Sequence, residues 1–257
     1  GTLSDYQINF NNGSSSFITY LASQQTQREH YTGIRPDTAT IEDVGHLSDP
    51  PYGISLNTTS QFGFQLNHKY ENLLGSNVFT VGSEYTSDNI MDEISAYNYL
   101  VDQKVKTIGV FLQSDWNLTE SINLLSGSRI DKHSLLDNMV ISPRMSLLYK
   151  LQKNTQFRMS YSTGFRAPQA FDADLHIAFA GGGISVIELS DDLKEERSKS
   201  FSSSINYDNS SSDYIYGFTL EGFYTRLDDA FYQDPNGSDD FGNKFIKRNG
   251  DGATVQG

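Results

Sequence analysis

Apolar and polar side chains alternate over unusually long runs, and this alternation most constrains how the chain can fold. In residues 61–70 the apolar side chains Phe62, Phe64 and Leu66 occupy every second position, and residues 155–166 and 198–207 repeat the pattern. A period of two places successive side chains on opposite faces of a β-strand, whereas a helix needs apolar residues three and four apart. We therefore expect an all-β chain whose strands have one apolar and one polar face.

The predicted strands are long. Several run for about 11 to 15 residues, against a common length of about 5 to 6 in globular proteins. Strands that cross a bilayer need about 9 to 11 residues within it, and longer strands project beyond it. The pattern predicts about eleven strands, at residues 5–10, 16–31, 59–71, 78–94, 103–117, 121–132, 140–152, 155–166, 195–208, 213–228 and 244–257.

Short and long connections between these strands alternate without a break. Short turns are expected at 11–13, 72–77, 117–120, 153–154 and 208–212, and long links at 32–58, 95–102, 133–139, 167–194 and 229–243. Outer-membrane barrels have tight periplasmic turns at one end and long extracellular loops at the other. Trp116, Tyr149 and Tyr207 lie beside short turns, as in an interfacial aromatic girdle. The fold class predicted is an antiparallel transmembrane β-barrel wall, an up-and-down meander of long strands.

Composition excludes several classes of function. The net charge is -13, which argues against nucleic-acid binding, because that requires clustered Lys and Arg. With no cysteine, the chain has no disulfide, thiol nucleophile or cysteine-based zinc site. No run approaches the roughly 18 apolar residues of a membrane-spanning helix, and the first residues lack a signal peptide's pattern. We expect the chain to begin inside a mature protein.

Several motifs in register carry a resemblance to a known family. The run from Ser162 to Pro168 resembles the barrel of TonB-dependent receptors, where a strand ending in G-F-R-A-P enters an extracellular loop. Residues 169–176 look like the form common in Bacteroidetes. Residues 193–198 are similar to the family's L-K-P-E-x-S pattern, with Glu195 in the place of its proline, and residues 221–229 resemble the following strand. The similarity spans most of residues 60–257.

The resemblance implies a 22-stranded barrel closed by a plug. Residues 1–257 would then be a partial barrel domain, about half of the wall. Nothing in them resembles a plug or the N-terminal segment that contacts TonB. The implied function is active import across the outer membrane of a large, scarce nutrient (siderophore, haem, cobalamin or glycan). The implied partners are TonB, the plug, lipid or lipopolysaccharide (LPS) and the nutrient. No catalytic residue is expected. The alternatives are a passive porin or adhesin-type barrel and a soluble β-sandwich binding module.

Candidate site residues are few. Four residues that end or follow the strand at 155–166 are candidates for ligand contact: Arg166, Phe171, Asp172 and His176. For Arg166, anchoring of the loop is favoured over direct ligand contact. Oxygen-bearing side chains around a glycine turn make calcium a candidate at Asp234, Asn236, Asp239 and Asp240, although Pro-Asn-Gly is already a sufficient turn signal. No other cofactor is expected. Three charged side chains are expected to face a wet lumen: Arg158, Lys199 and Glu221.

Overall fold

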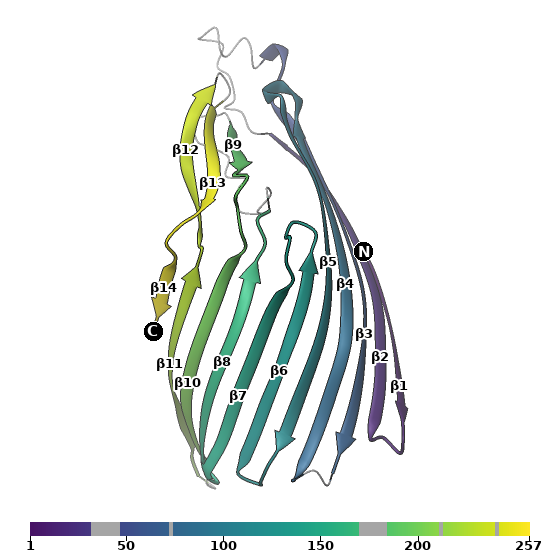
Figure 1. The fold of residues 1–257 in the computed structure, drawn as a ribbon, viewed down its shortest axis with the longest axis vertical. Helices are drawn as coiled ribbons and strands as arrows, with labels where there is room; N and C mark the ends of the chain where they lie inside the picture. Colours follow the sequence, from purple (N-terminus) through teal and green to yellow (C-terminus); the bar gives the residue numbers. More distant parts are fainter. Residues whose placement is uncertain (32–46, 72–73, 170–183, 211–212, 240–241) are drawn as a thin grey trace.

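One long antiparallel sheet forms the body of the molecule (Figure 1). The computed structural model describes residues 1–31, 47–71, 74–169, 184–210, 213–239 and 242–257. Eleven strands pair in chain order, apart from insertions above the sheet. They are β1 (Thr2–Phe10), β2 (Ser15–Tyr31), β3 (Tyr52–Tyr70), β4 (Ser76–Ile94), β5 (Tyr99–Asn117), β6 (Ile122–His133), β7 (Val140–Gln152), β8 (Thr155–Arg166), β10 (Glu196–Ser210), β11 (Ile215–Asp228) and β14 (Ala253–Gln256).

The meander and the sorting of its connections are as predicted. The short turns lie together at one end of the sheet, and the longer connections lie at the other (Figure 1). At the first turn Asn11 and Asn12 both adopt left-handed backbone angles, and the N–H of Gly13 donates to the carbonyl of Phe10 at 3.1 Å. Asparagine and glycine tolerate that conformation, so this hairpin closes with little strain.

Three central strands are longer than predicted. β3, β4 and β5 each contain 19 residues and extend toward the end of the sheet that carries the longer connections. The predicted link at 95–102 is therefore wrong in length, because only the 3₁₀ turn η1 (Ser95–Tyr97) and Asn98 separate β4 from β5. The predicted link at 32–58 is also too long, since β3 begins at Tyr52 and pairs with the end of β2 at Tyr31.

A second, three-stranded sheet continues beyond this end of the main sheet (Figure 1). It consists of β9 (Ile184–Leu189), β12 (Phe231–Asp239) and β13 (Gly242–Asn249), with β13 in the centre. The single strand predicted at 244–257 is wrong, because residues 250–252 divide it into β13 and β14. The link predicted at 229–243 contains β12, whose Pro235 is tolerated because β12 is an edge strand with a register shift at that point.

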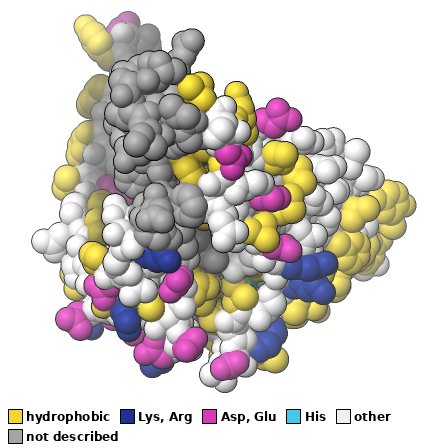
Figure 2. All heavy atoms as spheres, turned by 90° about the horizontal axis from the view of Figure 1, so that it is seen from above, with side chains coloured by type: hydrophobic (Ala, Val, Ile, Leu, Met, Phe, Trp, Pro, Cys, Tyr) yellow, Lys and Arg dark blue, Asp and Glu magenta, His cyan; other side chains and the backbone are white. Residues whose placement is uncertain are grey.

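The main sheet is a single layer, and one of its faces is apolar while the other is polar. Its apolar face presents Phe62, Val110 and Leu112 at 49%, 52% and 58% exposure, although each is flanked by strands on both sides. Buried apolar clusters among the described residues are small; one contains Ile94 and Tyr97. A dry core between two packed sheets is therefore absent from the described part of the chain, which argues against the soluble β-sandwich. Seen from above, hydrophobic side chains project at the right-hand edge, on the side of β1 and β2 (Figure 2).

The apolar face has the height of a bilayer. On β5 it runs from Trp116 to Ile108 without a charged side chain. Eight steps of about 3.3 Å make roughly 26 Å along the strand, and a tilt of about 40° reduces this to roughly 20 Å, close to the apolar band of about 25 Å in outer-membrane barrels. Among the described residues, no helix has the length and apolar character to cross a membrane.

Two of the three charged side chains predicted for the lumen lie on the polar face. Arg158 and Glu221 are both level with Ser204 of β10, on the face opposite Phe201. The prediction for Lys199 is wrong, because it lies two residues from Phe201 and therefore shares the apolar face. It lies two residues beyond Phe201, the last apolar residue on this face of β10.

The orientation of β8 gives a test with a matched pair. We expect Met159→Arg, on the apolar face, to reduce the free energy of unfolding by about 2–4 kcal/mol, because it places a guanidinium in lipid. Ser160→Arg, one residue along on the polar face, should cost less than 1 kcal/mol. Urea unfolding of the full-length protein in phospholipid vesicles measures both, and a larger cost for Ser160→Arg would contradict the assignment of the faces.

Candidate functional site on the lumen wall

The polar face of the sheet is its crowded, concave face. Side chains on it reach across neighbouring strands, while the apolar side chains opposite remain half exposed. At its centre lies a network of Tyr20 on β2, Glu84 on β4, and Arg129 and Asp131 on β6. Arg129 donates through Nε to Oδ1 of Asp131 at 2.7 Å, and its Nη2 lies 3.4 Å from Oε1 of Glu84. The Tyr20 hydroxyl donates to the other carboxylate oxygen of Glu84.

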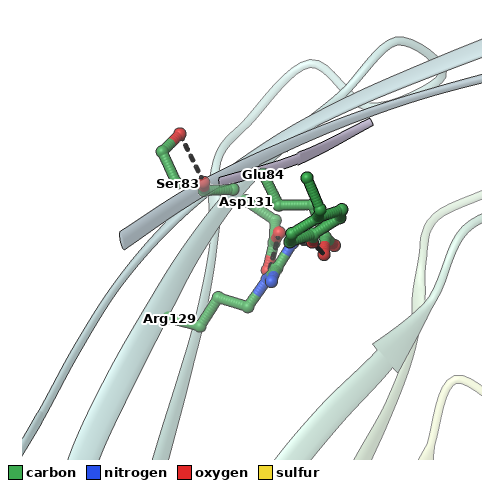
Figure 3. Close-up of polar contacts among 6 residues, drawn as sticks. Ser83, Glu84, Arg129 and Asp131 are labelled. Carbon is green, nitrogen blue, oxygen red and sulfur yellow. Dashed lines mark hydrogen bonds and ion pairs between the residues drawn. The ribbon is translucent and has the colours of Figure 1, made fainter. Parts of the chain in front are cut away.

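Figure 3 shows the guanidinium of Arg129 between the two carboxylates. The network ties together strands that are not neighbours, since β3 separates β2 from β4 and β5 separates β4 from β6. The side chains of Asp131, Glu84 and Arg129 are 4%, 24% and 34% exposed, so water screens the charges only in part. The network is therefore a brace across five strands of the wall.

Glycines on the intervening strands make room for this brace. Gly63 lies on β3 between Tyr20 and Glu84, and Gly109 lies on β5 between Glu84 and Asp131. A Cβ atom at Gly63 would overlap the Tyr20 ring, and one at Gly109 would overlap the guanidinium of Arg129. The long side chains consequently lie flat along the wall, which leaves the space in front of it open.

A recess of about 440 Å³ lies beside the brace. Its lining includes Arg129 and Arg144, together with Phe111, Gln113 and Ser162. Nη2 of Arg144 donates to Oε1 of Gln113 across Gly127, the same arrangement of a long side chain over a glycine. Arg144 has a neutral partner there, and it is available to bind a carboxylate or another anion bidentately.

The three-stranded sheet of β9, β12 and β13, here called the outer sheet, is attached to the barrel wall around one aromatic ring. Phe231, at the start of β12, lies between Arg166 at the end of β8 and Lys247 of β13, whose charged groups are 4.9 and 5.0 Å from the ring centroid. The carboxylate of Glu196 accepts from the backbone N–H of Phe231 at 2.9 Å and from Arg166 at 3.4 Å. Cation–π contacts contribute about 0.5–1 kcal/mol at exposed sites, as for Arg166, and about 2 kcal/mol where the cation is buried, as Lys247 is.

Asn249 completes this attachment and was not singled out by the sequence. Its amide nitrogen donates to the carbonyls of Asp229 at 2.7 Å and Lys194 at 3.1 Å, and its oxygen accepts from the N–H of Lys194 at 2.8 Å. Asparagine is common in turns, so no local signal distinguishes this residue from others. The entry and exit of the outer sheet are therefore tied to one side chain.

The structure gives only part of the predicted ligand contacts. Arg166 is bound to Glu196 and Phe231, which supports its role as a loop anchor, and its side chain stays 51% exposed. Phe171, Asp172 and His176 lie outside the described residues. Ligand contact by these four residues stays a prediction.

The predicted calcium site also stays a prediction. Asp234 and Asn236 lie on β12, where Asp234 is 3.5 Å from Nε of Arg248 and Asn236 is 3.5 Å from Glu188. Asp240 and the side chain of Asp239 are outside the described part of the chain. Across the described residues, no group of three or more His, Asp or Glu side chains has a metal-binding arrangement.

The acidic turn before β10 has its own hydrogen bond. The Ser190 hydroxyl donates to the carboxylate of Asp192, which lowers the pKa of Asp192, and this aspartate is exposed. A solvated loop end is the reading that this geometry supports.

Comparison with known families agrees with the fold. Residues 1–257 match the family described as "TonB dependent receptor-like, beta-barrel". The match covers the whole chain, so the chain belongs to this family. A comparison with curated protein sequences finds no match.

Solved structures show the same architecture at low sequence identity. The ferric enterobactin receptor of Pseudomonas aeruginosa, a mutant in complex with enterobactin, has a TM-score of 0.74 and 16% identity, covering 98% of this chain and 39% of that one. The siderophore receptor PirA of Acinetobacter baumannii has a TM-score of 0.69 and 16% identity, covering 98% and 40%. P. aeruginosa FpvA with a heterologous pyoverdine has a TM-score of 0.64 and 13% identity, covering 95% and 36%. The chain thus spans about two fifths of their length.

The brace predicts a specific coupling between two positions. We expect Gly63→Ala to cost about 1–3 kcal/mol of unfolding free energy, because the new Cβ displaces the Tyr20 ring. In a Tyr20→Ala background the same substitution should be nearly neutral, giving a coupling energy of at least about 1 kcal/mol in a double-mutant cycle. Gly222→Ala is the control, since its Cβ would meet only the oxygen of Gly257 at 3.7 Å. Equal costs of Gly63→Ala in both backgrounds would contradict the brace.

Proposed function

We propose that this chain forms part of the wall of an outer-membrane transporter that imports a large, scarce nutrient with energy delivered by TonB. The observation that carries the proposal is the membership of residues 1–257 in the TonB-dependent receptor barrel family. The sheet supports it physically, with an apolar face of bilayer height and a polar face of braced side chains. Such a protein makes and breaks no bond in its cargo, so it is not an enzyme.

The polar side chains of the lumen wall are held by their hydrogen-bond partners, and we assign them contacts with a plug or a cargo. The brace holds Tyr20, Glu84 and Arg129 flat against the strands, and this leaves clearance for a plug within the barrel. Arg144 in the recess and Arg158 below it provide cationic contacts for acidic groups of a plug or of a cargo. The partners proposed are therefore a plug domain, TonB, which would contact an N-terminal region outside this chain, and the lipids of the outer membrane.

The nutrient class proposed first is an iron–siderophore complex. Solved proteins with the same architecture include a ferric enterobactin receptor and a siderophore receptor. Arg144 and Arg158 offer local cationic contacts for an anionic cargo. Haem, cobalamin and glycans remain the other candidates, and the extracellular region around Arg166 is where their contacts would differ, because binding loops vary on a shared scaffold.

A passive barrel is the second candidate, and energy dependence separates the two. In cells that express the full-length protein as their sole receptor, we expect uptake of a radiolabelled ferric siderophore to stop when TonB is deleted or the proton gradient is collapsed. Binding at the cell surface should continue, because binding needs no energy. Uptake that survives both treatments and rises linearly with solute concentration would favour the passive barrel.

A test panel is needed because the cargo is unidentified. Ferric enterobactin, ferric pyoverdine, haemin, cyanocobalamin and a maltooligosaccharide can be compared as separate probes under the same conditions. Energy-dependent uptake of one probe supports the transporter and names its class. The absence of TonB-dependent uptake for every probe, in cells where surface labelling shows the protein in place, would contradict the proposal for these classes.

A further inference from the structure

The apolar face of the barrel wall ends in basic side chains at only one of its two ends. On β2 and β4 the first charged residues on this face are the acidic Glu29 and Glu93, which both lie opposite Ile54, farther from the band. On β5, β6, β10 and β11, the first charged residue beyond the apolar band is basic. These residues, which we call the basic belt, are Lys106, Lys132, Lys199 and Arg226. Acidic residues outnumber basic ones by 32 to 19 in the whole chain. The four charged residues nearest to the apolar band are thus all basic in a chain that is acidic overall.

Register places the belt directly above the lipid-facing residues. Lys132 lies opposite Ile108, and Lys106 lies two residues beyond Ile108 on the same strand and the same face. Lys199 and Arg226 lie opposite each other, two residues beyond the opposed rings of Phe201 and Tyr224. All four belt residues are exposed, and Nζ of Lys132 donates to the backbone carbonyls of Leu136 at 2.7 Å and Asp137 at 2.8 Å. Long cationic side chains in this position reach the headgroup layer while their stems stay in contact with the apolar band.

The opposite end of the same face has a different composition. Next to the short turns, the outward positions of the described strands carry aromatic, apolar or uncharged polar side chains, including Trp116, Tyr149, Tyr207 and Phe218. Lysines near that end, such as Lys69 and Lys150, lie on the polar face. General snorkelling at lipid interfaces would place cations at both ends, so the one-sided belt indicates negative charge in one leaflet only.

One pair in the belt already holds an oxyanion. Nζ of Lys199 and Nε of Arg226 converge on the two carboxylate oxygens of Asp228, at 2.8 and 2.7 Å. Asp228 supplies one negative charge against two positive ones, and the side chains of Lys199 and Arg226 remain 55% and 62% exposed. This exposure leaves further N–H groups of both side chains available to donate to a phosphate.

We propose that the basic belt binds phosphate groups of lipopolysaccharide in the outer leaflet. The end of the sheet that carries the belt also carries the longer connections, which are extracellular in outer-membrane barrels. The proposal rests on the outer-membrane location within the proposed function and adds the residues that contact the lipid. Lys104 lies two residues beyond Lys106 on the same face, farther from the apolar band, and extends the belt on β5.

Binding of purified lipids to the full-length protein in detergent tests this contact. Native mass spectrometry can compare diphosphoryl lipid A with its dephosphorylated form. Two variants remove the belt in separate places: Lys104→Gln with Lys106→Gln, and Lys199→Gln with Arg226→Gln and Asp228→Asn, which avoids leaving an unpaired carboxylate. The control, Lys150→Gln with Lys153→Gln, removes two positive charges at the short-turn end.

We expect the variant without Lys104 and Lys106 to bind diphosphoryl lipid A at least about tenfold more weakly, since each Lys or Arg near an anionic lipid surface contributes about 1 kcal/mol and 1.4 kcal/mol is tenfold. The triple variant loses a net single positive charge, so we expect it to bind about fivefold more weakly. Binding of the dephosphorylated lipid should be weak and equal in all variants. Equal binding of the two lipids by the unaltered protein, or an equal loss in the control, would overturn the proposal. The assay needs neither TonB nor a nutrient, so its result is independent of the uptake experiment.

Discussion

The hydrogen bonding of the backbone in a medium without water is the constraint on which the structure depends. In lipid every N–H and C=O must be paired within the protein, which leaves only helices and β-barrels as spanning structures. Antiparallel pairing along β2 to β11 satisfies the ladder over long runs, with strands of 12 to 19 residues. Once the ladder is fixed, each side chain has only two directions available. The division into a lipid face and a lumen face follows from the sequence alternation alone.

The lumen face adds a second level of organisation to this ladder. A bare polar wall would present long side chains to the interior, where they would compete with a plug or a cargo for space. Glycines at 63 and 109 instead let Tyr20 and Arg129 lie across the strands. Arg144 reaches across Gly127, and all three side chains bond to partners two strands away. The same contacts stiffen the wall, because they link strands that the ladder itself does not join.

The sequence predicted the architecture well and the details of the site poorly, for physical reasons. Alternation identified the strands of the main sheet from β1 to β11, since lipid selects apolar side chains at every second position, but it did not separate β14 from β13. The pattern weakened beyond the bilayer: Ser60 and Thr58 follow Phe62 on the outward side of β3, so the start of that strand at Tyr52 was missed. The sequence predicts a loop where the structure has β12, because Asp234, Pro235 and Gly237 are turn residues. The brace joins Arg129 to Glu84, 45 positions apart, and only the strand register brings them together. The resemblance to a Bacteroidetes-type receptor stays a prediction.

The central claim is that odd-numbered residues of β8 face lipid and even-numbered ones face water. Because the chain contains no cysteine, single cysteines at positions 157 to 161 of the full-length protein can each carry a nitroxide spin label in vesicles. Collision rates with oxygen, which concentrates in lipid, and with a water-soluble nickel chelate then report the surroundings of each label. The account predicts high oxygen and low nickel accessibility at 157, 159 and 161, and the reverse at 158 and 160. Uniform accessibility along the strand, or the opposite phase, would contradict it.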